Sequence, residues 1–288
     1  MRDVPVPVPE GQINVWHRPA APDAETAVLV HGLSGNSRWW SVVIEYLPPS
    51  MGVIAIDVRG RAGSADAPPP YDLTTIADDI TRALDHLDIP RAIVTGYSMG
   101  GWVAAMFGAN HPERAQRVIL VDGGLPIPLD PGADPVEVIN AMVGPSLRRL
   151  DMTFASEEEF FDHWKDHPAF AANWDDSMGE ALGHELSSAG AGFRVRASGQ
   201  AIEVGAREIT VGDEANRAAA RLEVPTHVIV VERGTLDQPG GMIPRHVAEE
   251  LAESKSNVTM EYLPGLNPYT LVRGRGAPSV ASAIAGSG

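Results

Sequence analysis

Short runs of consecutive apolar residues recur along the chain, separated by longer segments in which apolar residues return every three to four positions. The runs stand at residues 26–30, 53–58, 92–95, 117–121 and 226–231. A run that is apolar at nearly every position is typical of a parallel strand buried on both faces. The segment 72–87 predicts an amphipathic helix, because its apolar side chains fall on one stripe. Strands that alternate with helices predict an α/β fold with a mostly parallel sheet flanked by helices.

The pattern changes at both ends and in the middle of the chain. The opening VPVPEGQINVWHRP predicts antiparallel strands at the sheet edge, where prolines are tolerated. Between residues 125 and 224 the strand signal is weak and helical patterns dominate, at 135–150 and 157–165 for example. We therefore predict a core domain formed by residues 1–124 and 225–288, with residues 125–224 inserted as a helical cap over the strand ends.

Composition and charge narrow the class of partner. The 288 residues include Lys+Arg 22 and Asp+Glu 38, which gives a formal net charge of -16. Nucleic-acid binding and docking on an anionic membrane both need clustered cations, so we expect neither. The chain has Cys 0, and its most apolar segment, 92–108, is interrupted by glycine and serine. These features predict a soluble cytoplasmic protein whose partner is a small molecule.

The segment AIVTGYSMGGWVAAMFG contains Gly96-Tyr97-Ser98-Met99-Gly100, a G-x-S-x-G pattern between a predicted strand and a predicted helix. A chain that reverses this sharply places the serine at positive φ and needs tiny residues two positions before and after it. The hydroxyl then stands at a helix N-terminus, where the dipole favours a developing negative charge. Ser98 is therefore the candidate nucleophile.

The strand at 26–30 runs directly into His31-Gly32-Leu33-Ser34-Gly35. A loop at this place directs the backbone N–H of Leu33 toward the same point as the N–H of Met99, which supplies two donors for an oxyanion. For His31 we favour a role in ordering the loop over a chemical role.

Together these motifs resemble the α/β-hydrolase family over nearly the whole chain. The resemblance rests on the loop at residues 31–35, the D-x-R-G segment at residues 57–60, the Ser98 turn, HPERAQRVILVDGG at residues 111–124, and the cap insertion. It implies an eight-stranded, mostly parallel sheet, with Ser98 as nucleophile and Leu33 and Met99 as oxyanion-hole donors. It also implies Asp237 as the catalytic acid, with Asp122 as the position that some members use instead.

One element of the family's triad is missing from this sequence. In similar proteins the stretch after the last strand reads N-H-Y-T, whereas here it reads Asn267-Pro268-Tyr269-Thr270. Pro268 therefore occupies the position of the catalytic histidine. Because a serine is a weak nucleophile without a base, ordinary Ser-His-Asp turnover is in doubt.

Three interpretations of the function remain open. The protein is a hydrolase of ester or lactone type with an atypical or incomplete triad, in which a relocated base such as His31 serves. Alternatively it catalyses a non-hydrolytic step (a cyclisation, lyase or rearrangement reaction) on an apolar metabolite. The third interpretation is a non-catalytic protein that binds a ligand in the old pocket.

Aromatic residues indicate the character of the substrate. Trp39 and Trp40 follow the His31 loop, and the cap segment adds others such as Trp164. We expect these tryptophans and His31 to line a pocket for a small apolar or aromatic substrate. His163 and His167 lack the intervening glutamate of a metal-binding helix, and no dinucleotide or P-loop fingerprint is present, so we expect no metal and no cofactor. A homodimer remains an open expectation.

Overall fold

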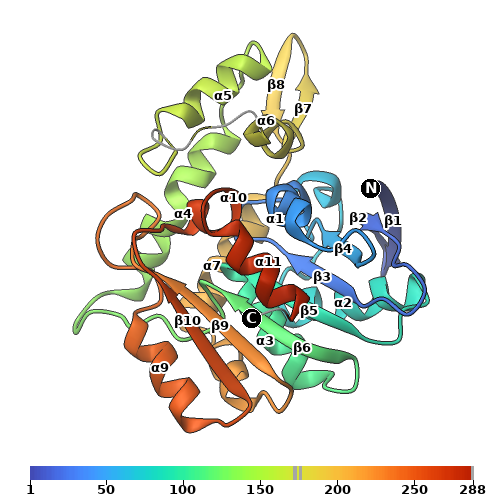
Figure 1. The fold of residues 1–288 in the computed structure, drawn as a ribbon. Coiled ribbons are helices and arrows are strands. Elements are labelled where there is room, and N and C mark those ends of the chain that lie inside the picture. The colour runs from blue at the N-terminus through green and yellow to red at the C-terminus, as the bar shows by residue number, and fades with distance from the viewer. Residues whose placement is uncertain (171–173, 175–176, 287–288) are drawn as a thin grey trace.

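The computed structural model describes residues 1–170, 174 and 177–286. Eight strands form one sheet in the order β1-β2-β4-β3-β5-β6-β9-β10 (Figure 1). The strands β1 and β2 pair antiparallel, as do β2 and β4, and all other neighbours are parallel. The predicted eight-stranded, mostly parallel sheet is thereby confirmed. The strand bounds are β1 (Arg2–Val8), β2 (Gly11–Arg18), β3 (Thr26–Val30), β4 (Gly52–Ile56), β5 (Ala92–Tyr97), β6 (Ala115–Val121), β9 (Thr226–Val231) and β10 (Val258–Leu263).

The central strands are buried on both faces, as their unbroken apolar runs predict. Along β3, Val28 and Val30 belong to one core cluster, while Ala27 and Leu29 belong to the cluster on the opposite face. The strand β4 ends two residues earlier than its apolar run. Its successor Asp57 still donates its backbone N–H to the carbonyl of Asn14 in β2 at 3.0 Å, while its carboxylate accepts the backbone N–H of Ser37 at 2.7 Å.

The edge strand β1 contains two prolines. Pro5 lies opposite Asn14 of β2, and Pro7 lies opposite Gln12. Alternate residues of a strand direct their N–H groups to the same side, so positions 5 and 7 share one side and 4, 6 and 8 the other. Because proline has no N–H to donate, we infer that the side of residues 5 and 7 faces away from β2.

Helices cover both faces of the sheet (Figure 1). The helix α2 illustrates why they form: its buried stripe includes Leu73, Ile76 and Ile80, and Asp72 caps it by accepting the N–H of Thr75 at 2.8 Å. Helices α2 (Leu73–His86), α3 (Met99–Asn110), α8 (Asp213–Ala218) and α9 (Arg245–Ser254) pack into one core cluster. The other cluster takes α1 (Ser41–Tyr46), α10 (Pro268–Arg273) and α11 (Ala277–Ala285).

The segment 125–224 holds α4 (Pro135–Leu150), α5 (Glu157–Lys165), α6 (Ser177–Gly183), β7 (Leu186–Ala189), β8 (Gly192–Val195), α7 (Gly199–Val211) and α8. In Figure 1, α5, α6, β7 and β8 stand beyond the end of the main sheet. The hairpin β7–β8 was not expected from the sequence, because its strands have four residues each and little alternation. Gly190 at φ 62 supplies the turn between them. Near the end of this segment, Ala215 and Ala218 of α8 belong to the same buried cluster as one face of the main sheet.

Single-turn 3-10 helices occupy Ser37–Trp40, Ala62–Ser64 and Ala219–Arg221. Within the part of the chain that the structure describes, no helix combines the length and the apolar character needed to cross a membrane.

Candidate active site

Ser98 lies at the sharp turn between β5 and α3. Its φ of 51° and ψ of -125° are strained for a residue with a side chain, which confirms the backbone geometry predicted for it. The surrounding glycines are needed for close approach: a Cβ on Gly96 would lie 1.8 Å from the carbonyl oxygen of Gly100. The backbone N–H of Ser98 donates to Val121 at 2.9 Å, which ties the turn to β6. The side chain of Ser98 remains partly exposed.

The loop at residues 31–35 lies directly beside Ser98. A Cβ on Gly32 would stand 3.1 Å from the Cβ of Ser98 and 3.4 Å from its Oγ. Met99 is the first residue of α3, so its N–H is one of the helix donors without an intrahelical partner. The structure therefore brings Ser98, Leu33 and Met99 together at the end of β5.

His31 is fully buried and both of its ring nitrogens are engaged. Nδ1 donates to the carbonyl of Gly32 at 2.7 Å, and Nε2 accepts the N–H of Val58 at 3.1 Å. Burial lowers the pKa of His31 to about 4, so the ring is neutral. Neither nitrogen is free to take a proton from Ser98 or to contact a substrate. His31 orders the loop, and its placement in a pocket wall, or as a relocated base, is corrected accordingly.

Asp237 lies next to the position of the missing histidine. Its Oδ1 accepts Asn267 Nδ2 at 3.0 Å and Arg233 Nε at 2.8 Å. The hydrogen bond from Asn267, followed by that from Arg233, lowers the pKa of Asp237. The carboxylate is thus held as an anion, and Asn267 connects it to residue 268.

Pro268 is buried and forms the first position of α10, where a missing N–H costs no intrahelical bond. Asn267 caps this helix: its Oδ1 accepts the N–H of Thr270 at 2.9 Å, and the hydroxyl of Thr270 accepts the N–H of Asn267 at 2.9 Å. The proline is therefore well accommodated as a helix start.

Asp122 offers a second carboxylate close to the serine turn. It follows β6 at φ 46° and is fully buried, and neither carboxylate oxygen accepts a well-formed hydrogen bond from a described residue, although the backbone N–H of Val231 lies close enough to interact with it. Burial raises the pKa of Asp122 to about 7, with the backbone N–H of Val231 opposing the rise. The next residue, Gly123, packs against Ser98: a Cβ there would lie 2.0 Å from the carbonyl oxygen of Ser98.

An aromatic cluster joins the cap segment to the strand ends. The ring of Trp39 lies 5.9 Å from that of Tyr269 and 6.0 Å from that of Phe170, and Phe170 lies 4.4 Å from Tyr269. Trp164 packs on Phe170 at 5.6 Å. Trp40, by contrast, packs edge-on against Tyr97 inside the core, so the expectation that it lines a pocket is corrected.

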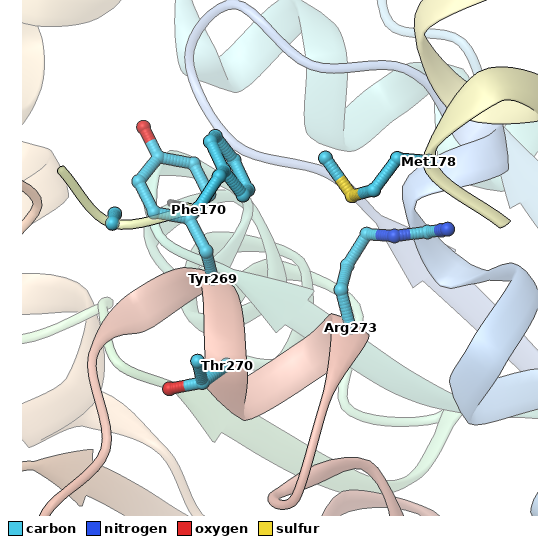
Figure 2. A pocket seen from close by; sticks show the side chains of 6 residues that line it. Phe170, Met178, Tyr269, Thr270 and Arg273 are labelled. Atoms are coloured by element: carbon cyan, nitrogen blue, oxygen red, sulfur yellow. The ribbon is translucent and has the colours of Figure 1, made fainter. Parts of the chain in front are cut away.

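A small cavity adjoins this cluster. Figure 2 shows Phe170 and Tyr269 on one side of it and Met178 and Arg273 on the other. Its volume of about 10 Å³ has room for about one water molecule. Neither Ser98 nor His31 nor any of the predicted tryptophans is among its lining residues, so this cavity is not the substrate pocket that the sequence predicts.

A buried ion pair lies beneath the aromatic rings, and sequence reasoning missed it. Arg149 Nη2 stands 3.7 Å from Glu185 Oε2, and the guanidinium lies 4.6 Å from the ring of Trp164. Glu185 Oε1 accepts the N–H groups of Trp39 and Asn36, each at 3.3 Å. Burial raises the pKa of Glu185, and the Arg149 charge opposes this. The pair was not predictable, because only the fold brings α4 to the residue before β7.

The described residues contain no group of three or more His, Cys, Asp or Glu side chains arranged to hold a metal ion.

The eight-stranded sheet and the strained serine between β5 and α3 define a class of hydrolase-like α/β proteins. The family model described as alpha/beta hydrolase fold matches residues 27–253. The chain belongs to the alpha/beta hydrolase fold family.

Curated relatives match over a shorter stretch. The chain is 30% identical over 115 residues to a putative carbamate hydrolase, RutD, of Caulobacter sp., which is 40% of this chain and 43% of that protein. It is 35% identical over 103 residues to a poly(3-hydroxyalkanoate) depolymerase of Ectopseudomonas oleovorans, 36% of each protein. It is 32% identical over 100 residues to 3-oxoadipate enol-lactonase 2 of Acinetobacter baylyi, 35% of this chain and 38% of that protein. The chain thus spans less than half the length of these relatives.

Solved structures match over the whole length. The crystal structure of E-2-(acetamidomethylene)succinate hydrolase superposes with a TM-score of 0.79 at 18% identity, covering 99% of this chain and 98% of that one. A thioesterase domain from the curacin biosynthetic pathway superposes with a TM-score of 0.72 at 16% identity, covering 99% of both chains. At these identities the likeness establishes the fold.

Proposed function

We propose that the protein hydrolyses an ester- or lactone-type bond in a small apolar or aromatic metabolite, through Ser98. The observation that carries the proposal is the strained, partly exposed serine at the turn between β5 and α3. Strain of this kind persists where the surrounding structure enforces it, and it is typical of a functional residue. The proposal is also supported by the curated relatives, which are a putative carbamate hydrolase, a poly(3-hydroxyalkanoate) depolymerase and an enol-lactonase.

In the proposed reaction, Ser98 Oγ attacks the carbonyl carbon and the carbonyl oxygen becomes an oxyanion. The backbone N–H groups of Leu33 and Met99 donate to that oxyanion, and removing one such donor typically costs 10²–10³ in kcat. The Ser98 proton passes to solvent, the leaving group takes a proton from solvent and departs as an alcohol, and water then hydrolyses the acyl-enzyme, which releases the acid and restores Ser98. Residues 125–224 are proposed to cap this site, and the aromatic cluster around Trp39 and Trp164 supports an apolar or aromatic substrate.

Proton transfer is the step for which this chain is poorly equipped. Pro268 cannot accept the Ser98 proton, and His31 has no free nitrogen. Oxyanion stabilisation and binding alone still give about 10³–10⁴-fold over water in serine proteases that lack a triad member. We therefore expect slow turnover, with Asp237 as the proposed acid held beside residue 268.

A second candidate function is supported by the local structure at residue 268. Pro268 is a well-capped helix start, and the carboxylate of Asp237 is already paired with Arg233 and Asn267. A site arranged in this way suits a non-hydrolytic reaction (a cyclisation, lyase or rearrangement step) or simple ligand binding, neither of which needs an acyl-enzyme.

The two candidate functions are distinguished by measuring p-nitrophenyl acetate hydrolysis by the wild type and by Ser98→Ala. We expect slow wild-type turnover without an acyl-enzyme burst, and a further loss of about tenfold or more in Ser98→Ala, which leaves only the part of the rate that the oxyanion hole and binding supply. Ser254→Ala, at the exposed end of α9, is the matched serine control and keeps the wild-type rate. Undiminished turnover in Ser98→Ala would contradict the proposed nucleophile. No turnover in any variant, together with calorimetric binding of an apolar ligand, would favour the second function.

A further inference from the structure

Arg61 is a buried arginine that contacts both proposed oxyanion-hole residues. Its side chain is 1% exposed, and its Nε donates to the carbonyl of Leu33 at 3.0 Å. Its Nη2 stands 3.8 Å from the sulfur of Met99 and donates to the carbonyl of Ala201 in α7 at 2.9 Å. Its Nη1 donates to the carbonyl of Arg59 at 2.8 Å. One guanidinium therefore joins the loop at residues 31–35, the start of α3 and the helix α7.

The neighbouring Arg59, which is also buried, has a carboxylate counter-ion, as buried arginines usually do. Its guanidinium forms a two-pronged ion pair with Asp79, at 2.5 and 2.9 Å. In the described part of the chain, no carboxylate forms an ion pair with Arg61, and burial lowers the pKa of Arg61 to about 10. A buried charge without a counter-ion is costly, and carbonyl oxygens offset only part of that cost. A buried cation of this kind stabilises a negative charge that develops close to it.

The helix α7 packs unusually close to the same three residues. A Cβ on Gly205 would lie 2.8 Å from the sulfur of Met99, 2.9 Å from Cδ1 of Leu33 and 3.3 Å from Nη2 of Arg61. The chain around Arg61 is also tied to the segment before α7, because Ala62 N–H donates to Arg196 and Ser198 N–H donates to Gly60, each at 2.8 Å. The position of α7 and that of the Leu33 loop are therefore set together.

We propose that Arg61 is the positioning residue of the oxyanion hole and the link through which α7 fixes it. By holding the Leu33 carbonyl, Arg61 fixes one of the two peptide planes that flank the Leu33 Cα, and so restricts the direction of the Leu33 N–H. Its positive charge also stabilises the oxyanion through the low-dielectric interior. This inference rests on the proposed role of Ser98.

Phenylboronic acid tests the arrangement without requiring turnover. The Ser98 hydroxyl adds to the trigonal boron, an O–B bond forms, the proton leaves to solvent, and the tetrahedral boronate carries the negative charge. We expect Arg61→Met, which keeps the side-chain length, to weaken this affinity by about 10–100-fold, in line with a misplaced donor. Arg61→Lys keeps the charge but not the three-pronged geometry, and we expect an intermediate loss.

Two controls make the result specific. Arg59→Met removes a buried arginine from the same segment, and we expect it to lower stability while the folded protein binds the boronate as the wild type does. Ser98→Ala tests the proposed function itself, because boronate binding that does not depend on Ser98 rejects the nucleophile and not Arg61. Circular dichroism establishes that each variant is folded under the conditions of the assay.

Amide hydrogen exchange tests the positioning role of Arg61 even if Ser98 does not react with the boronate. We expect residues 31–35 to exchange at least about tenfold faster in Arg61→Met than in the wild type, and to be unchanged in Arg59→Met. Wild-type boronate affinity in folded Arg61→Met would overturn the proposal. If no variant binds boronate through Ser98, unchanged exchange at residues 31–35 in Arg61→Met would overturn it instead.

Discussion

The raised pKa of Asp122 predicts how the stability of the protein depends on pH. Burial raises its pKa from 3.8 to about 7. Between these two pH values the unfolded chain has released the proton while the folded protein keeps it, so stability falls as the pH rises through this window and is constant above it. We expect Asp122→Asn to abolish this dependence. Its stability relative to the wild type should increase between pH 4 and 7, by at most about 4 kcal/mol.

Urea unfolding of the two proteins at several pH values measures the difference, in which the other titrating groups cancel. Asparagine tolerates the left-handed backbone at residue 122, so the variant tests charge and not conformation. A difference in stability that does not change with pH would show that Asp122 is ionised throughout and has a partner.

Single residues were predictable where a pattern fixes the backbone. Ser98 was found because the turn between a buried strand and a helix demands small neighbours at fixed spacing. The ionisation states of Asp122 and His31 were not predictable in the same way, since they depend on burial and on partners that are distant in the sequence. The hydrogen bond between His31 and Val58 joins residues 27 positions apart.

At the level of the element, α10 determines what a restored histidine can do. We expect Pro268→His to raise aryl-ester turnover by about 10²–10⁴-fold, the range of a positioned general base. The first position of a helix accepts histidine, and the Asn267 cap stays in place. The rate of p-nitrophenyl acetate hydrolysis measures the gain.

Adding Asp237→Asn or Asp122→Asn to the Pro268→His variant identifies the acid that orients the new ring, because only one of them should remove the gain. A folded Pro268→His protein with no gain would show that α10 directs residue 268 away from Ser98.

Elements were predictable in proportion to the strength of their periodicity. The strands β3 and β9 and the helices α4 and α5 have the bounds that their apolar patterns indicate. The hairpin β7–β8 was missed because its short strands are stabilised by pairing with each other, which a local pattern does not record. The helix α10 was missed because it has only 6 residues and its start is set by an N-terminal capping box between Asn267 and Thr270 and not by an apolar pattern.

On the scale of the whole molecule, the contact between His184 and Asp57 is one of several that tie the cap segment to the core. His184 Nε2 lies 2.7 Å from Asp57 Oδ2, and Asp57 is fully buried with its pKa lowered to about 2. Burial alone would raise that pKa, and the lowering comes chiefly from His184. These residues are 127 positions apart, so no sequence pattern links them.

We expect His184→Ala to lower stability by about 1.5–3 kcal/mol, the value of a hydrogen bond to a charged group. Asp57 keeps its bonds from Ser37 and Asn14, so the core should stay folded. Urea unfolding measures the loss, and limited proteolysis should show faster cleavage within residues 125–224. His163→Ala, on the exposed side of α5, serves as the control. Equal cleavage of both variants would argue against the contact as a tether.

The two prolines of β1 have a consequence for how copies of this protein meet. A free sheet edge is a template onto which another chain can add a strand, and fibrils grow in this way. At positions 5 and 7 the outward side of β1 offers no amide hydrogen to an incoming strand. The covalent structure of β1 therefore disfavours growth of a continuous sheet from this edge.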